Sequence, residues 1–161
     1  MSQTFIKLYD LHTKSGEMHG KVEWISIRPE RKAAVVPVDK VQATTEAGLH
    51  GDHDTQSHRQ VTLIAQEALD AVARQLGKDA IDPAKTRRNI VISGLAFDQL
   101  DNAEIRIGEA LVEVTGICHP CQLMDQNLGD GGRTAMEGYM AGLTARVLKT
   151  GLIAIGDDVS V

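Results

Sequence analysis

The chain has 161 residues and a mass of 17.4 kDa, which suits one domain and leaves no room for a second large one. Hydrophobic residues make up 42% and charged residues 24%, as in folded globular proteins, so disorder and membrane-spanning segments are poor interpretations. The formal net charge of -5 gives no general attraction to nucleic acids or anionic membranes. Any phosphate-binding site must therefore be local.

The first residues form no recognisable targeting signal. Met1 to Lys14 has neither a continuous apolar run nor a small-residue cleavage site, so we expect a cytoplasmic protein with no membrane partner. Residues 1–19 are interpreted as a leader segment and residues 20–161 as the single domain.

The first half of the domain predicts strands and one long loop. Residues 20–28 predict a strand, and their alternation changes phase at Trp24-Ile25, which is typical of a β-bulge or of a strand buried on both faces. Residues 33–38 and 41–44 are rich in β-branched residues, and Pro37 favours a sheet edge or a strand end. The polar segment from Glu46 to Arg59 predicts a loop.

One helix has a clear pattern. After a short apolar run at residues 61–64, apolar residues recur at helical spacing and stop before Gly77, which suits a left-handed cap. The residues that define this helix are Leu69, Val72, Ala73 and Leu76.

The second half predicts mostly strands. Residues 90–92 form one, and the runs on either side of Gly108-Glu109 predict a β-hairpin. Residues 143–148 and 152–161 add two or three more. The total of seven to nine short strands with few helices predicts a mainly β (α+β) protein, either a barrel or a sandwich.

The segment Cys118-His119-Pro120-Cys121 carries the sharpest chemistry and allows several interpretations. A dithiol redox site would use both thiols, but that motif normally precedes a substantial helix, and here only residues 122–128 stand before a glycine-rich stretch. A structural zinc would need further ligands, for which His50, His53 and His58 are candidates. Two buried thiols without chemistry are a further possibility. The last alternative is that Cys121 alone acts as a thiolate, either binding a metal or carrying sulfur as a persulfide.

Two polar clusters could complete such a site. Arg87, Arg88 and Asn89 precede a predicted strand, and guanidinium groups bind phosphate through paired hydrogen bonds. The loop from His50 to Arg59 contains glycines that permit close approach of the backbone to a ligand. Each cluster taken alone is more often a solvated surface than a binding site.

Taken together, these segments resemble the MOSC domain, named for the C-terminal domain of molybdenum cofactor sulfurase. The resemblance extends over about residues 20 to 161. The segments that carry it, in order, are His50-Gly51-Asp52, Arg59 to Ile64, Arg87 to Val91 with Gly94, Gly108 to Ala110, Cys118 to Cys121, and Gly142-Leu143 to Gly156-Asp157.

The resemblance implies a MOSC-type β-barrel with a few short helices and a site for the molybdenum cofactor (molybdopterin). Pro120-Cys121 matches the family's Pro-Cys, so Cys121 would be the metal ligand or sulfur acceptor, while Cys118 has no assigned role. Arg87, Arg88 and Asn89 match the family's Arg-Asn turn and would hold the cofactor's phosphate or pterin edge. His50, Asp52 and Arg59 match the preceding loop and are further candidates for cofactor binding.

The family includes reductases of N-hydroxylated compounds and proteins that handle sulfur. We expect a small molybdenum-dependent reductase of such compounds, served by an electron-donor protein, in which His119 donates a proton to the departing water. The alternative is a sulfur carrier or cofactor-delivery protein that holds a persulfide on Cys121 and works with a cysteine desulfurase. Neither the N-terminal barrel of the amidoxime-reducing members nor a desulfurase domain is expected in a chain of this length.

Overall fold

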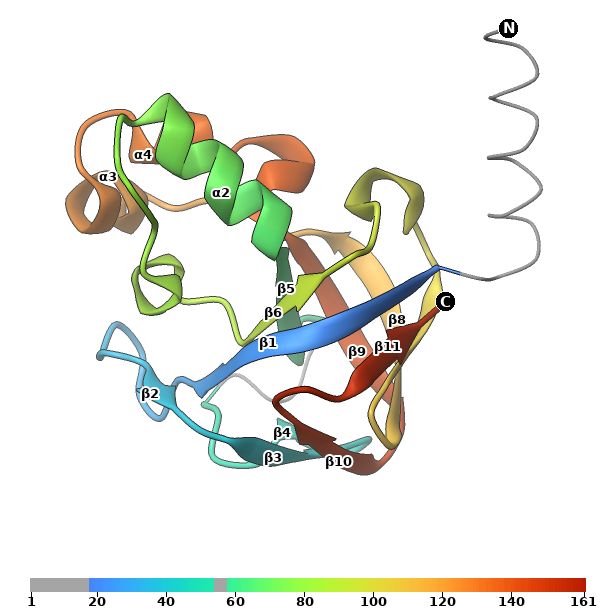
Figure 1. The fold of residues 1–161 in the computed structure, drawn as a ribbon. Helices are drawn as coiled ribbons and strands as arrows, with labels where there is room; N and C mark the ends of the chain where they lie inside the picture. The colour runs from blue at the N-terminus through green and yellow to red at the C-terminus, as the bar shows by residue number, and fades with distance from the viewer. Residues whose placement is uncertain (1–17, 54–57) are drawn as a thin grey trace, which may run out of the picture.

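Seven strands close a barrel in the computed structural model, which describes residues 18–53 and 58–161 (Figure 1). They are β1 (His19–Ile27), β5 (Val61–Ala65), β6 (Ile90–Ser93), β7 (Glu104–Ile107), β8 (Ala110–Ile117), β9 (Leu143–Lys149) and β11 (Asp158–Ser160). Their order around the barrel is β11, β7, β8, β9, β5, β6 and β1, and antiparallel pairing of β1 with β11 closes it. The expectation of a mainly β barrel is confirmed.

Four short strands lie beside the barrel. Strand β2 (Val36–Pro37) pairs with β1 at the sheet edge, where Pro37 was expected. Strands β3 (Lys40–Thr44), β4 (Gly48–Leu49) and β10 (Gly151–Ala154) form a separate sheet in the order β10, β3, β4. The prediction that residues 46–59 contain only loop is therefore wrong at β4. The described residues contain eleven strands rather than seven to nine, because two-residue strands leave no periodic pattern in a sequence.

The local predictions for the barrel strands agree with the structure. The register of β1 against β6 shifts between Val22 and Trp24, so the bulge lies next to the predicted phase change. Strands β7 and β8 form the predicted hairpin, and Gly108 in its turn has the positive φ of 57° that favours glycine.

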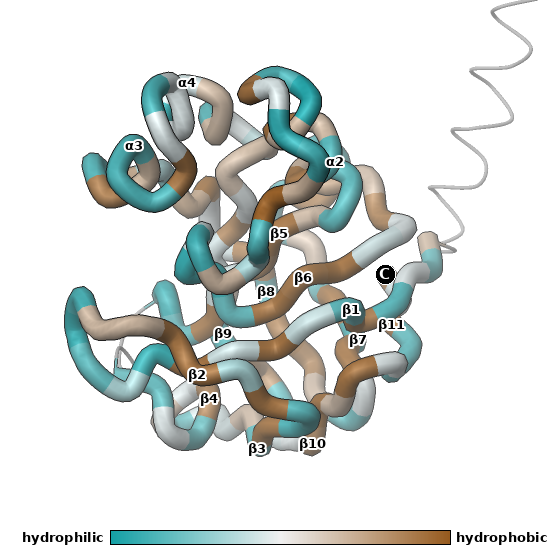
Figure 2. Tube along the Cα trace, turned by 60° about the vertical axis from the view of Figure 1, so that its left-hand side comes forward, coloured by the Kyte–Doolittle hydropathy of each residue, from teal (hydrophilic) through white to brown (hydrophobic). Residues whose placement is uncertain are grey.

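The core fills the barrel with aliphatic side chains. Every residue of β5 and the first three of β6 are buried, because the barrel interior covers one face and helix α2 (Gln66–Gln75) packs against the other. Helix α2 ends before Gly77, whose φ of 68° confirms the predicted cap. Figure 2 shows hydrophobic positions along β5, β6 and β1 below this helix.

Several short helical segments gather at one end of the barrel. They are η1 (Pro83–Thr86), α3 (Leu123–Leu128), α4 (Gly132–Ala135) and η3 (Gly138–Ala141), while η2 (Phe97–Gln99) precedes β7. We call η1, α3, α4, η3 and the cysteine loop (residues 118–121) the helical end. Helix α3 contacts both η1 and α4, and Figures 1 and 2 show α3 and α4 beside α2.

Two expectations concern residues that the structure does not describe. Residues 1–17, which hold most of the expected leader segment, lie outside the described ranges, as do residues 54–57 of the histidine-containing loop. Within residues 18–53 and 58–161, no helix combines the length and the apolar character needed to cross a membrane.

Candidate functional site

The cysteine loop connects the end of strand β8 to helix α3 and exposes only one of its two thiols. Cys118 is buried, and its amide continues the β8–β9 ladder by donating to the carbonyl of Gly142 at 2.9 Å. Cys121 is exposed, and its carbonyl accepts a hydrogen bond from Met124 at the first turn of α3. Both cysteines are free. Only Cys121 can therefore present its sulfur to a ligand without rearrangement of the loop.

Arg88 holds the cysteine loop in place from inside the protein. Its buried guanidinium donates to the carbonyl oxygens of Ala141 at 2.8 Å, Thr86 at 3.0 Å and Cys118 at 2.8 Å. Burial lowers the pKa of the Arg88 guanidinium, whereas the Cys118 and Cys121 thiols favour its charged form. Arg88 therefore links η1, η3 and the cysteine loop, as a residue that positions Cys121.

Asn89 and Asp52 form a buried polar network between strands. Asn89 accepts hydrogen bonds from the amide and hydroxyl of Thr62, and it donates to the carbonyl of Ser26 and to Asp52 at 3.2 Å. Asp52 also accepts from the backbone amide of Arg28 at 2.6 Å and forms an ion pair with its guanidinium at 2.8 Å. These two side chains join β1, β5 and β6 to the loop after β4. The role observed for them is structural, and direct contact with a cofactor stays a prediction.

Arg87 has a different environment from its neighbour. It adopts a left-handed backbone conformation with φ of 60°, and its guanidinium donates to the carbonyl of Ala33 in the loop after β1. Burial is the main cause that lowers the pKa of Arg87, and the nearby Arg28 guanidinium lowers it further, while Cys121 and Asp52 oppose the shift. Arg87 is therefore the member of the Arg-Arg-Asn segment that lies beside an open pocket.

The remaining predicted residues are more widely spread. Arg59 is exposed, and its Nη2 lies 3.8 Å from the Sγ of Cys118, so it approaches the cysteine loop. His119 is exposed and faces a hollow of about 610 Å³ that Pro120 and Arg133 also line. His50 is exposed directly after β4, and its backbone amide donates to the carbonyl of Gln42 at 2.9 Å. The roles proposed for His119 and His50 stay predictions.

Cys121 lies in a surface hollow of about 560 Å³, which we call the thiol hollow. Its lining residues are Lys32, Pro120, Cys121, Gln122, Leu123, Gln126 and Arg133. The sequence analysis did not identify Lys32 and Arg133, because they lie in segments remote from Cys121 with no motif of their own. Their ammonium and guanidinium groups make the surroundings of the thiol locally positive, although the whole chain is acidic.

The other interpretations of the two cysteines receive less support. No group of three or more His, Cys, Asp or Glu side chains in residues 18–53 and 58–161 is arranged to hold a metal, so the described chain offers no structural zinc site of the predicted kind. The six-residue helix α3 is also short for a thioredoxin-like site, and the second thiol that such a site needs is buried.

Solved structures of several bacterial proteins share this fold. The YuaD protein from Bacillus subtilis superimposes with a TM-score of 0.75 at 18% identity, over 89% of this chain and 95% of its own. YiiM from Geobacillus stearothermophilus superimposes with a TM-score of 0.70 at 19% identity, over 88% of this chain and 75% of its own. YiiM from Escherichia coli superimposes with a TM-score of 0.66 at 20% identity, over 87% of this chain and 68% of its own.

The sequence itself identifies the family. No curated protein matches the chain. The family model described as the MOSC domain matches residues 49–160, a segment that contains Asp52, Arg59, the Arg-Arg-Asn segment and the cysteine loop. Because this match extends over more than half of the residues, the chain belongs to the MOSC domain family.

Proposed function

We propose that the protein binds the molybdenum cofactor through Cys121 and reduces N-hydroxylated compounds. MOSC domains are a family associated with binding of the molybdenum cofactor. The single observation that carries the proposal is the exposed Cys121 thiol in a cation-lined hollow, held from behind by buried Arg88.

The residues present fit such a cofactor. A thiolate is a suitable ligand for a polarizable metal, and Cys121 is the accessible thiol of the pair. The cofactor also carries a phosphate, which guanidinium and ammonium groups bind well. Arg87 beside the site and Lys32 and Arg133 in the thiol hollow supply these groups.

Different residues would hold different parts of the cofactor. Cys121 would hold the metal through Sγ, and the guanidinium of Arg87 would bind the anionic part of the cofactor. When bound, the cofactor supplies two-electron oxygen-atom transfer. Arg88 keeps the cysteine loop at a fixed distance from η1 and η3, so that the thiol is presented in one orientation.

Reduction of an N-hydroxylated compound consumes two electrons and two protons and releases one water. An electron-donor protein would supply the electrons. The imidazole of His119, exposed next to Pro120, would donate a proton to the departing hydroxyl oxygen, a role for which histidine is the most frequent side chain. The small-molecule substrate would enter through the open side of the thiol hollow.

The test is metal and pterin analysis of the protein purified from a cofactor-producing host. We expect stoichiometric molybdenum and pterin in the wild type and neither in Cys121→Ala. Cys118→Ser is the matched control, because it changes the thiol that is buried, and it should retain the cofactor. Wild-type protein without molybdenum, or Cys121→Ser with full reductase activity, would contradict the proposal.

The exposure of Cys121 also favours a second candidate function, a sulfur carrier. An exposed thiol next to cations can accept sulfur from a cysteine desulfurase as a persulfide. In that case, intact-mass analysis after incubation with a desulfurase and cysteine would show one additional sulfur on Cys121, removable by reductant, and desalting would leave no bound molybdenum.

A further inference from the structure

A second hollow adjoins the thiol hollow at the helical end, and the two share Pro120 and Arg133. Its volume is about 610 Å³, which is in the range of small-ligand sites. We call it the mixed-charge hollow, because a guanidinium and a carboxylate both line it. The lining residues are His119, Pro120, Arg133, Thr134, Glu137 and Gly138. A ligand bound here would lie next to Cys121.

The polar side chains of this hollow do not hold the protein together. In the part of the chain that the structure describes, no hydrogen bond or ion pair is found for the side chains of His119, Arg133, Thr134 and Glu137. Arg133 contributes only its backbone amide, which donates to the carboxylate of Asp125 at 3.0 Å. All four side chains are therefore available to a ligand.

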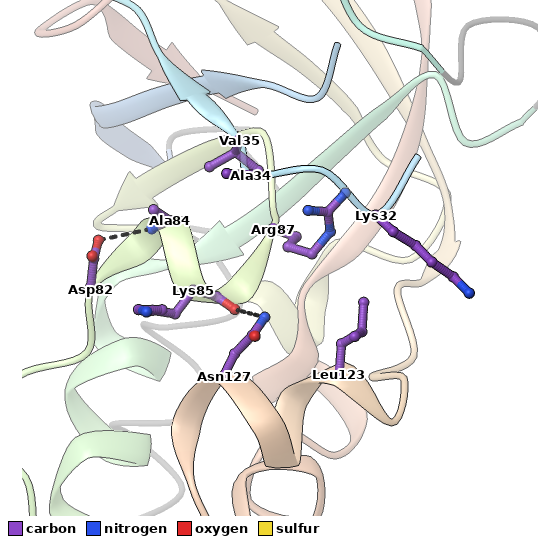
Figure 3. Close-up of a pocket in the computed structure, with 9 residues that line it drawn as sticks. All are labelled: Lys32, Ala34, Val35, Asp82, Ala84, Lys85, Arg87, Leu123 and Asn127. Atoms are coloured by element: carbon purple, nitrogen blue, oxygen red, sulfur yellow. Dashed lines mark hydrogen bonds between the residues drawn. The ribbon is translucent and has the colours of Figure 1, made fainter. Parts of the chain in front are cut away.

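The pocket drawn in Figure 3, between η1, α3 and the loop after β1, uses its polar groups differently. The Asp82 carboxylate accepts a hydrogen bond from the amide of Ala84 at 3.0 Å and caps η1. The amide nitrogen of Asn127 donates to the carbonyl of Lys85 at 3.0 Å. Figure 3 also shows the Lys85 side chain extending away from Arg87. Polar groups in that pocket stabilise the helical end, whereas those of the mixed-charge hollow do not.

Opposite charges line the mixed-charge hollow without neutralising each other. Arg133 lies in α4 and Glu137 directly precedes η3, and no ion pair joins their side chains, although they are only four positions apart. Two unpaired charges of opposite sign on one concave surface attract a ligand that carries both signs. A carboxylate of the ligand can accept paired hydrogen bonds from the guanidinium, and an ammonium group can donate to the carboxylate.

The rest of the lining suits a small zwitterion. A Cβ at Gly138 would meet no atom within 4 Å, so this glycine leaves open space beside the backbone. The hydroxyl of Thr134 can donate to a ligand carboxylate. Pro120 lines both hollows and offers an apolar surface on the way to Cys121. An ammonium group and a carboxylate on one carbon, with a side chain that passes Pro120, match this combination.

We propose that the mixed-charge hollow binds a free α-amino acid, with Arg133 on the α-carboxylate and Glu137 on the α-ammonium group. The side chain of the amino acid would extend past Pro120 toward Cys121. One further statement rests on the proposed function: the substrate would be an α-amino acid N-hydroxylated on its side chain, because Glu137 already engages the α-amino group. The binding step itself does not depend on that function.

Calorimetry with three matched ligands tests the site on protein from a cofactor-deficient host. L-norleucine carries both charges, hexanoate lacks only its amino group, and pentylamine lacks only its carboxylate. We expect norleucine to bind at least about ten-fold more tightly than either analogue, because only norleucine engages both side chains.

Two variants should affect these ligands in a crossed pattern. Arg133→Gln should weaken the binding of norleucine and hexanoate about three- to ten-fold and leave pentylamine unchanged. Glu137→Gln should weaken norleucine and pentylamine by a similar factor and leave hexanoate unchanged. A general disturbance of the fold would instead weaken all three ligands. The matched controls are Arg74→Gln and Asp79→Asn, at exposed residues outside the hollow, which should change nothing.

Norleucine binding no tighter than that of its two analogues, or an equal loss for all three ligands in both variants, would overturn the proposal. Because this protein carries no cofactor, either result is independent of whether molybdenum binds to Cys121. Conversely, failure of molybdenum binding would leave the calorimetric result standing.

A second measurement on cofactor-loaded protein tests the amino acid as substrate. The two substrates are Nδ-hydroxyornithine and N-propylhydroxylamine, which has the same hydroxylamine group but neither α-charge. We expect Glu137→Gln to raise KM about ten-fold for Nδ-hydroxyornithine and to leave KM for N-propylhydroxylamine unchanged. Equal changes in KM for both compounds would overturn the amino acid as substrate.

Discussion

The barrel and the helical end are built on different physical principles. In the barrel, aliphatic side chains such as Leu63, Ile90 and Ile105 are completely buried between paired strands. The helical end consists of segments of four to six residues, too short to be stable alone, that pack against one another and against α2. The candidate site lies at the helical end, so the barrel acts as its fixed support.

Gly142 lies where the two regions meet, and its replacement should have the largest effect. An alanine Cβ there would lie 2.1 Å from the carbonyl oxygen of Leu63, and the φ of 97° already disfavours alanine. We expect Gly142→Ala to lower the free energy of unfolding by about 3–5 kcal/mol in urea denaturation. The control is Gly129→Ala, with a similar φ of 93° and no atom within 4 Å, which should cost about 1–2 kcal/mol. An equal loss of unfolding free energy in Gly142→Ala and Gly129→Ala would show that the two regions are not in tight contact at Gly142.

Two buried or half-buried asparagines allow a direct comparison of the regions. Asn89→Ala in the barrel leaves the buried amide of Thr62 without its acceptor and removes the donor to the carbonyl of Ser26, so we expect a loss of about 3 kcal/mol in the free energy of unfolding. Asn127→Ala on α3 removes one hydrogen bond at the surface and should cost less than about 1 kcal/mol. Similar losses would mean that the helical end contributes to global stability as strongly as the barrel.

Replacement of Arg88 should loosen the helical end more than the barrel. Lysine cannot reach all three carbonyl acceptors of the guanidinium, so Arg88→Lys should cost about 2 kcal/mol. Amide hydrogen exchange shows which of the two regions loses stability in Arg88→Lys. We expect faster exchange at the amide of Cys118 and unchanged exchange in β5. Uniformly faster exchange would instead place Arg88 in the folding unit of the barrel.

The smallest effect concerns the exposed edge of η3. The hydroxyl of Tyr139 donates to Asp101, and this hydrogen bond raises the pKa of the phenol above its ordinary value. The Tyr139–Asp101 hydrogen bond therefore stabilises the folded protein below the pKa that Tyr139 has in the unfolded chain. This stabilisation is lost as the pH rises through the higher pKa of Tyr139 in the folded protein. Absorbance titration in a Tyr9→Phe background should show the raised pKa, and Asp101→Asn should lower it towards the ordinary value.

The sequence allows the barrel to be predicted better than the helical end. Strands β5 to β8 have local signals, such as the apolar run at residues 61–64 and the turn at Gly108, and these signals agree with tertiary packing. Helices α3 and α4 were not predicted, because Gly129, Gly131 and Gly132 disfavour helix and only contacts with distant segments stabilise them.

The candidate site was predictable only where a motif marked it. Cys121 and Arg87 could be identified as candidates from the sequence. The different environments of Arg87 and Arg88 could not, because these adjacent residues have the same side chain, yet Arg87 lines an open pocket and Arg88 is buried. Lys32 and Arg133 lie about 90 and 12 positions from Cys121, and chain folding alone brings them together. Their contribution depends on loop geometry, which no periodic pattern encodes.

The pairing that closes the barrel has a consequence for synthesis of the protein. Residues 19–21 in β1 pair with residues 158–160 in β11, so the ring of strands is completed by contacts between nearly opposite ends of the chain. On the ribosome, β1 must wait for almost the entire polypeptide to emerge before this partner exists. The part of β1 at residues 19–21 therefore lacks its barrel partner until translation is nearly complete, although the other end of the same edge can pair early with β2.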